Sequence, residues 1–392
     1  MNQTNVTVKA VGDAPTLQSN ERRLSQSVLM ISAFAIVAAL YAYQFWIQGG
    51  RDYLNPDGYV YLAVARGEAV VRPHNTRLVI PFLASQVAGV LGVSTHTIFL
   101  IITPVCLFAS LLLLAKLLAR RGVTPAYQAA VVLALGAALA VIFGHTPLLV
   151  DTPLLLLACL TIAALDRQKL LLALALVCVA ALTKEYGVFL ALPWAVEAYR
   201  KFGWRMAGGL LIPFALLAVT VALQPAQPRV TTGELFGYQQ SLIAQSGLLA
   251  YGKTLIIWMW AALWPILGFL TFHVLSAARR RVTLTTDQLR YAAVLFSAPL
   301  LLLSDIDRVA MYIVPFACMA GATIGEFQET RFCALLACGG LATALARPLY
   351  TEVGVPRVFT LTMIAVCLAA STLLLARMLI HVRGRVPMFK PA

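Results

Sequence analysis

The feature that most constrains this chain is a series of apolar runs of about membrane-spanning length, recurring from Ser27 almost to the C-terminus. A soluble chain of 392 residues needs more polar surface than 60% hydrophobic and 12% charged residues provide. The mean hydropathy is +0.84. The runs predict an all-α, polytopic helical membrane protein with about twelve transmembrane helices. The expected spans are 27–47, 97–118, 124–143, 148–165, 169–183, 185–199, 206–224, 253–275, 289–304, 309–325, 331–346 and 357–377.

We expect one membrane domain over residues 25–380, with a polar tail at 1–24 and a basic tail at 381–392. The first apolar run is expected to stay as an anchor, because the segment before it is too long and acidic for a signal peptide and no A-x-A site follows. The seven cysteines all lie within apolar runs and form no CxxC pair, which favours plain packing.

The run 79–92 is too short to cross a bilayer, because about 14 residues give roughly 21 Å of helix against a ~30 Å core. We expect an interfacial helix there. With that assignment, 20 of the 30 Lys and Arg residues and 7 of the 16 acids share one side. The positive-inside rule then predicts a cell (inner or plasma) membrane protein with both termini cytoplasmic. No basic tract interleaved with aromatics occurs, so we expect no nucleic-acid partner.

The long polar segment RDYLNPDGYVYLAVARGEAVVRPHNTRLVIPF, residues 51–82, lies in the first outside loop under this topology. Asp57 is at its centre, and His74 and Arg77 follow in RPHNTRL. A carboxylate in such a loop is a candidate general base, and the basic side chains are candidate anion ligands. Asn-Pro-Asp-Gly is also ordinary turn chemistry, in which Asp bonds its own backbone, and that alternative stays open.

Further charges lie at the outside ends of later apolar runs, where charge is costly and usually pairs or lines a functional cavity. They are Asp151, Lys184 and Glu185, Asp305, Asp307 and Arg308, and Arg347. Asp151 would also suit a plain helix start. A single helix over 168–199 would be about 46 Å long, so we expect two short spans that meet at a recessed Lys184-Glu185. Those two residues can pair with each other or with neighbours, or Lys184 can bind phosphate.

Acids and cations that converge on one membrane face favour an anionic, lipid-linked substrate. In sugar transfer from a polyprenyl phosphate, one carboxylate accepts the proton of an acceptor hydroxyl and cations stabilise the leaving phosphate. We therefore interpret Asp57 and Asp151 as the catalytic candidates. The candidates for substrate or phosphate binding are Lys184, Glu185, Arg308, Asp305, Asp307, Arg77, His74 and Arg347.

This placement of residues resembles the GT-C superfamily of polytopic glycosyltransferases. The shared features are Asp57 in the first outside loop, a short helix beginning RLVIPF, Asp151 before a span, Lys-Glu between two short spans and D-x-D-R before a later one. The resemblance implies a polyprenyl-phosphate-linked sugar donor, as in mannosyl- and aminoarabinosyltransferases, and a lipid or glycan acceptor among membrane lipids. It maps the family's first-loop aspartate, a catalytic base or acceptor-binding acid, onto Asp57 and the second-loop acid onto Asp151. The family's phosphate-binding cations map onto Lys184 and Arg308. Gly58 stands where the family often has a second acid, which leaves the acceptor and a possible divalent metal open.

Two other classes remain. A secondary transporter or lipid flippase would also be polytopic and basic inside, but transporters usually place charge near mid-membrane in two related halves. A non-catalytic assembly subunit could retain the same helical shell, because fold does not determine function. Loss of activity on changing Asp57 would separate an enzyme from such a subunit.

Overall fold

The computed structural model describes residues 17–47, 56–68, 70, 74–145, 147–223, 264–280, 283–297 and 312–351, and single positions between 362 and 376. Within these ranges every regular element is a helix, which confirms the all-α prediction for the described part. The α-helices are α1 (Leu17–Ile47), α2 (Pro56–Ala65), α3 (Val79–Leu91), α4 (Thr95–Arg120), α5 (Pro125–His145), α6 (Asp151–Asp166), α7 (Leu170–Thr183), α8 (Ala191–Phe202), α9 (Trp204–Ala207), α10 (Leu211–Leu223), α13 (Trp264–Arg280), α14 (Thr286–Leu295), α16 (Val314–Gly321) and α17 (Thr330–Thr351). The 3₁₀ helices are η1 (His74–Thr76), η2 (Glu185–Leu190), η3 (Gly208–Leu210) and η6 (Gly325–Gln328).

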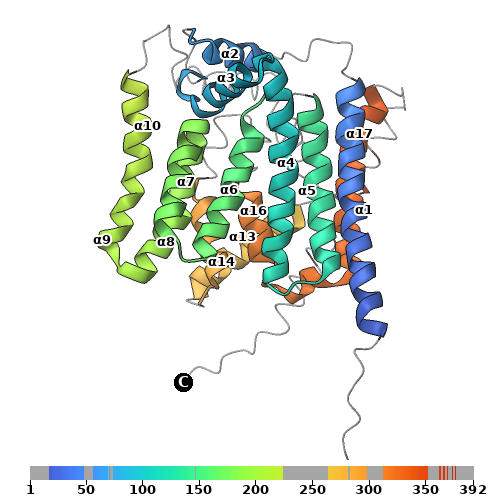
Figure 1. Ribbon diagram of the computed structural model, residues 1–392. Helices are drawn as coiled ribbons and strands as arrows, with labels where there is room; N and C mark the ends of the chain where they lie inside the picture. The colour runs from blue at the N-terminus through green and yellow to red at the C-terminus, as the bar shows by residue number, and fades with distance from the viewer. Residues whose placement is uncertain are drawn as a thin grey trace, which may run out of the picture.

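Among the described residues, four helical segments are long and apolar enough to cross a membrane: Ser25–Trp46, Thr95–Arg120, Pro125–Gly144 and Trp204–Leu223. They run side by side with the shorter helices α6 and α7 (Figure 1). These helices indicate a membrane protein, because a soluble bundle has no need for so many strongly apolar helices of spanning length. The expected spans 253–275, 289–304, 309–325 and 357–377 lie partly outside the described residues, so the count of twelve stays a prediction.

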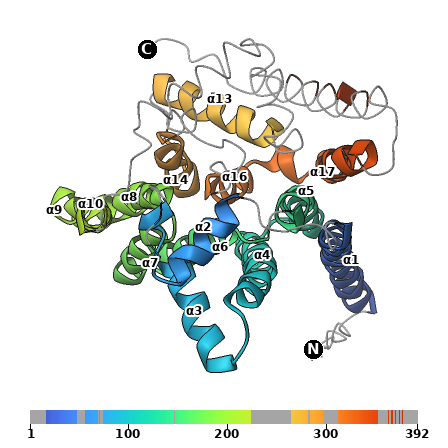
Figure 2. The same cartoon turned by 90° about the horizontal axis from the view of Figure 1, so that it is seen from above.

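Helix α3 lies across one end of the bundle rather than along it. Seen from above, α2 and α3 stretch over the ends of helices that are viewed down their axes (Figure 2). At 13 residues α3 is about 20 Å long, and Gly92 ends it in the left-handed conformation with φ of 66°. The prediction that 79–92 forms a short helix set apart from the spans is therefore confirmed. Its place at a membrane interface stays a prediction.

The core is built around α5, which packs against α1, α4 and α17. Small residues let these backbones approach closely, as is common between membrane helices. A Cβ on Gly136 would lie 2.7 Å from Val37 Cγ2 of α1, and one on Gly340 of α17 would lie 2.4 Å from the Ala134 Cα of α5. Larger side chains at either glycine would push the helices apart.

A buried ionic network joins α4, α6, α8 and α14 at the end opposite to α2 and α3. Arg121 donates to Asp166 at 2.8 Å and to Asp287 at 2.7 Å. Arg290 donates to Asp166 at 2.6 Å and to Glu197 at 3.0 Å. Sequence reasoning treated these two arginines only as markers of the cytoplasmic side. The structure shows that they also hold three acids inside the bundle.

Candidate functional site

Helix α2 places Asp57 and Tyr61 on one face. Pro56 begins the helix, where its missing N–H costs nothing, and Asp57 lies in the first turn, where the helix dipole favours a carboxylate. Tyr61 follows four residues later and is completely buried. The NPDGY segment therefore begins a helix with Asp57 in its first turn, and the alternative that Asp57 has only a structural role at this turn stays open.

The segment that follows α2 returns to this face through η1. His74 Nε2 lies 3.8 Å from Asp57 Oδ1, and the imidazole stands edge-on to the Tyr61 ring with 5.6 Å between ring centroids. The backbone N–H of Leu78 donates to the carbonyl of Leu182 near the end of α7 at 3.1 Å. This hydrogen bond ties the first loop to the break between α7 and α8.

Arg77 connects the loop to that break. Its Nε and Nη2 donate to the two carboxylate oxygens of Glu185 at 2.9 Å and 2.6 Å, a bidentate pair, and its Nη1 donates to the Tyr61 hydroxyl. Nη1 also lies 3.3 Å from His74 Nδ1. Burial lowers the pKa of Arg77, but the charges of Glu185 and Tyr61 and the hydrogen bonds to both residues together outweigh burial and hold that pKa well above its ordinary value. Arg77 is therefore a permanent cation and a donor only.

The helix is broken at Lys184, as expected from the length argument. Helix α7 ends at Thr183, Lys184 is extended with φ of −157° and ψ of 137°, and η2 begins at Glu185. The break is tight, because a Cβ on Gly187 would lie 2.2 Å from the carbonyl oxygen of Ala180. Lys184 and Glu185 thus leave the helical path and turn toward different partners.

Lys184 donates to Asp151 in a pair that is removed from solvent. Asp151 lies in the first turn of α6, one residue after the N-cap position, which Val150 occupies. The ammonium also lies 5.8 Å from the centroid of the Tyr186 ring. The alternative that Asp151 acts only as a helix cap does not describe this carboxylate, because it also meets a buried cation.

Six of the ten residues predicted from the sequence therefore form one cluster at the end of the bundle that carries α2 and α3. They are Asp57, His74, Arg77, Asp151, Lys184 and Glu185. Exposure divides them into an outer and an inner layer. The side chains of Asp57, Glu185 and His74 are 27%, 21% and 19% exposed, whereas those of Arg77, Lys184 and Asp151 are 6%, 3% and 0% exposed. The outer layer is open to solvent, and the inner layer is closed off from it.

The remaining predicted residues are not placed. Asp305, Asp307 and Arg308 lie outside the described residues. Arg347 lies in the last turns of α17, and its side chain is outside the described part. Sequence reasoning missed Tyr61 and Tyr186, which line the cluster. Two features of the sequence could have identified them: Tyr61 follows Asp57 by four residues, which is one helical turn, and Tyr186 is adjacent to Glu185.

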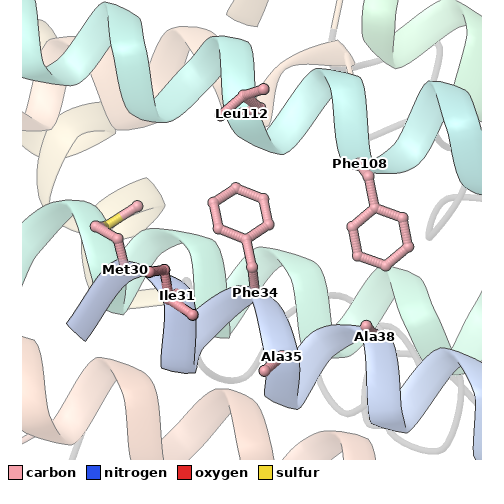
Figure 3. A pocket seen from close by; sticks show the side chains of 7 residues that line it. All are labelled: Met30, Ile31, Phe34, Ala35, Ala38, Phe108 and Leu112. Atoms are coloured by element: carbon pink, nitrogen blue, oxygen red, sulfur yellow. The ribbon is translucent and has the colours of Figure 1, made fainter. Parts of the chain in front are cut away.

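An apolar groove of about 720 Å³ lies between α1 and α4, away from this cluster. Figure 3 shows the side chains that line it: Met30, Ile31, Phe34, Ala35, Ala38, Phe108 and Leu112. All seven are apolar, so the groove offers no group for catalysis and suits hydrocarbon.

Among the residues that the structure describes, no group of three or more His, Cys, Asp or Glu side chains is arranged to hold a metal ion. The possible divalent metal stays an open prediction. Comparison with protein-family models, with curated proteins and with solved structures gave no match. The function must therefore be argued from the cluster itself.

Proposed function

We propose that the protein is a membrane glycosyltransferase of the GT-C type, which moves a sugar from a polyprenyl-phosphate donor to an acceptor hydroxyl at the extracytoplasmic face. The proposal includes about twelve spans and cytoplasmic termini. The observation that carries it is the cluster, in which the first loop, the start of α6 and the α7–η2 break bring three acids, two cations and a histidine to one end of a bundle with spanning helices.

Asp57 is the general base of this proposal. It is the most exposed acid of the cluster, and it lies on the same face of α2 as Tyr61, whose buried ring fixes that face of the helix. A carboxylate in this position can accept the proton of an acceptor hydroxyl as that oxygen attacks the anomeric carbon. Asp151 has no exposed surface, so its role is to hold Lys184 rather than to meet the acceptor.

The phosphate of the donor requires cations beyond this cluster. Arg77 and Lys184 are balanced by Glu185 and Asp151, so with a neutral histidine the six residues carry a net charge of −1. A phosphate would not enter such a site without further positive charge. The proposal assigns that role to Arg308 and Arg347, the cations expected at the same membrane face.

The function is tested with purified full-length protein and a panel of polyprenyl-phosphate sugars, with and without a chelator of divalent cations. A comparison of glycolipids and cell-surface glycans with and without the gene selects the donor and acceptor. D57N should lower transfer by ~10²–10⁴-fold, about 3–5 kcal/mol of barrier, while leaving the unfolding transition unchanged.

The matched control is E68Q. Glu68 is an acid of the same segment, but its side chain is 52% exposed and pairs with Arg66 on the surface. Transfer by this variant should equal that of wild type. Equal transfer by D57N and wild type would remove Asp57 from the role of base. Absence of transfer by the wild type from every donor would favour a non-catalytic subunit or a transporter.

A further inference from the structure

The imidazole of His74 lies between the guanidinium of Arg77 and the carboxylate of Asp57, and its two nitrogens face these different partners. Nδ1 lies 3.3 Å from Arg77 Nη1, and Nε2 lies 3.8 Å from Asp57 Oδ1. Within the described part of the chain, the charged and titratable groups seen against the ring are Asp57 and Tyr61 from α2 and Arg77 from its own segment, with Glu185 behind Arg77.

Arg77 determines which nitrogen can carry the proton. A guanidinium has N–H donors only and no acceptor, so a favourable contact with Nδ1 requires that Nδ1 is unprotonated. A neutral imidazole with a bare Nδ1 carries its proton on Nε2. Arg77 cannot turn away easily, because Glu185 holds its other two nitrogens in a bidentate pair.

We propose that Arg77 fixes His74 as the neutral tautomer with its proton on Nε2, and that this N–H positions the carboxylate of Asp57. His74 is then a positioning residue that acts through Asp57. The 3.8 Å separation is longer than a hydrogen bond, and catalytic contacts of this kind often tighten only when substrate binds. The catalytic consequence rests on the proposed glycosyltransferase function, whereas the tautomer and the coupling to Asp57 do not.

The tautomer is read directly from full-length protein in detergent with ¹⁵N-labelled histidine. The chain has five histidines, and the signal that disappears in H74N belongs to His74. Near neutral pH this signal should show a protonated Nε2 and a bare Nδ1. A protonated Nδ1, in either the other tautomer or the imidazolium, would overturn the assignment.

The coupling to Asp57 is read from the titration of the same signal. An opposite charge about 4 Å away favours the protonated ring, so D57N should move the titration midpoint of His74 down by about one unit or more. E68Q is the control and should leave the midpoint in place, because Glu68 pairs with Arg66 at the surface. An unchanged midpoint in D57N would refute the coupling.

The rate of sugar transfer adds a third readout, measured in two variants, H74N and H74Q, whose side chains differ by one methylene. The side-chain amide of Gln can place an N–H where Nε2 stood, whereas the shorter side chain of Asn places its amide near the position of Nδ1. H74N should lower transfer by up to about 10²-fold, the cost of misplacing a reacting group by about 1 Å, and H74Q should restore most of that loss. Equal losses in both variants would contradict the positioning role. A wild type without transfer would refute the proposed function and leave the two spectroscopic readouts to decide this inference.

Discussion

The buried pair of Lys184 and Asp151 gives the sharpest prediction about stability. Their side chains are 3% and 0% exposed, so neither charge can find water when the other is removed. K184M keeps most of the side-chain volume but leaves Asp151 as an uncompensated buried carboxylate. Breaking a buried pair in this way costs about 3–5 kcal/mol, whereas loss of a surface pair costs about 0–1 kcal/mol. We expect K184M to lower the free energy of unfolding by the larger amount, about 3–5 kcal/mol.

The double variant separates charge from packing. Replacement of both partners by apolar residues, K184M with D151L, removes both desolvation costs, so most of the lost stability should return. The free energy of unfolding is measured in mixed micelles of increasing denaturing detergent, for wild type, both single variants and the double variant. A coupling free energy below about 1 kcal/mol in this cycle would show that the pair does not act as a buried unit.

Three further predictions test the break, the far network and the topology. G187A should cost about 1–3 kcal/mol, because its Cβ would lie 2.2 Å from a backbone oxygen, whereas G89A, with nothing within 4 Å, should be neutral or stabilising in the same assay. Burial raises the pKa of Asp166, but the hydrogen bonds and the charges of Arg121 and Arg290 together outweigh burial and lower that pKa. The stabilising contribution of Asp166 should therefore be complete above pH ~4 and lost as pH falls further. If the free energy of unfolding of D166N fell at acidic pH in the same way as that of wild type, this prediction would be contradicted. A cysteine at position 68 in place of Glu68 should be labelled from outside intact cells and one in place of Lys201 should not, and the reverse pattern would overturn the topology.

Much of the fold follows from the lengths of the apolar runs in the sequence. The positions of α4, α5 and α7 match the apolar runs to within a few residues, because a helix that crosses hydrocarbon must be apolar along its length. The break at Lys184 follows from the same length argument. The form of the break does not, since the 3₁₀ helix η2 depends on the close approach of Gly187 to α7, which is a tertiary contact.

The candidate site was predicted as a set of residues but not as a set of pairs. Charge at the ends of apolar runs pointed to Asp151, Lys184 and Glu185, because such charge is rare unless it is paired or functional. Arg77 was predicted from the long polar segment 51–82. The partners could not be inferred, since adjacent Lys184 and Glu185 turn to Asp151 and to Arg77 rather than to each other. That choice depends on the extended backbone at Lys184, which no local pattern specifies.

The two buried charge clusters meet in one helix. Helix α6 begins at Asp151, which pairs with Lys184, and ends at Asp166, which pairs with Arg121 and Arg290. Its 16 residues span about 24 Å. Over that distance the charge of each carboxylate is largely offset by the cations that pair with it. Direct electrostatic influence of one cluster on the other is therefore small. An effect of the far network on the site can instead pass through the position of α6, which joins Asp166 to Asp151, or of α8, which carries Glu197 and continues directly from η2.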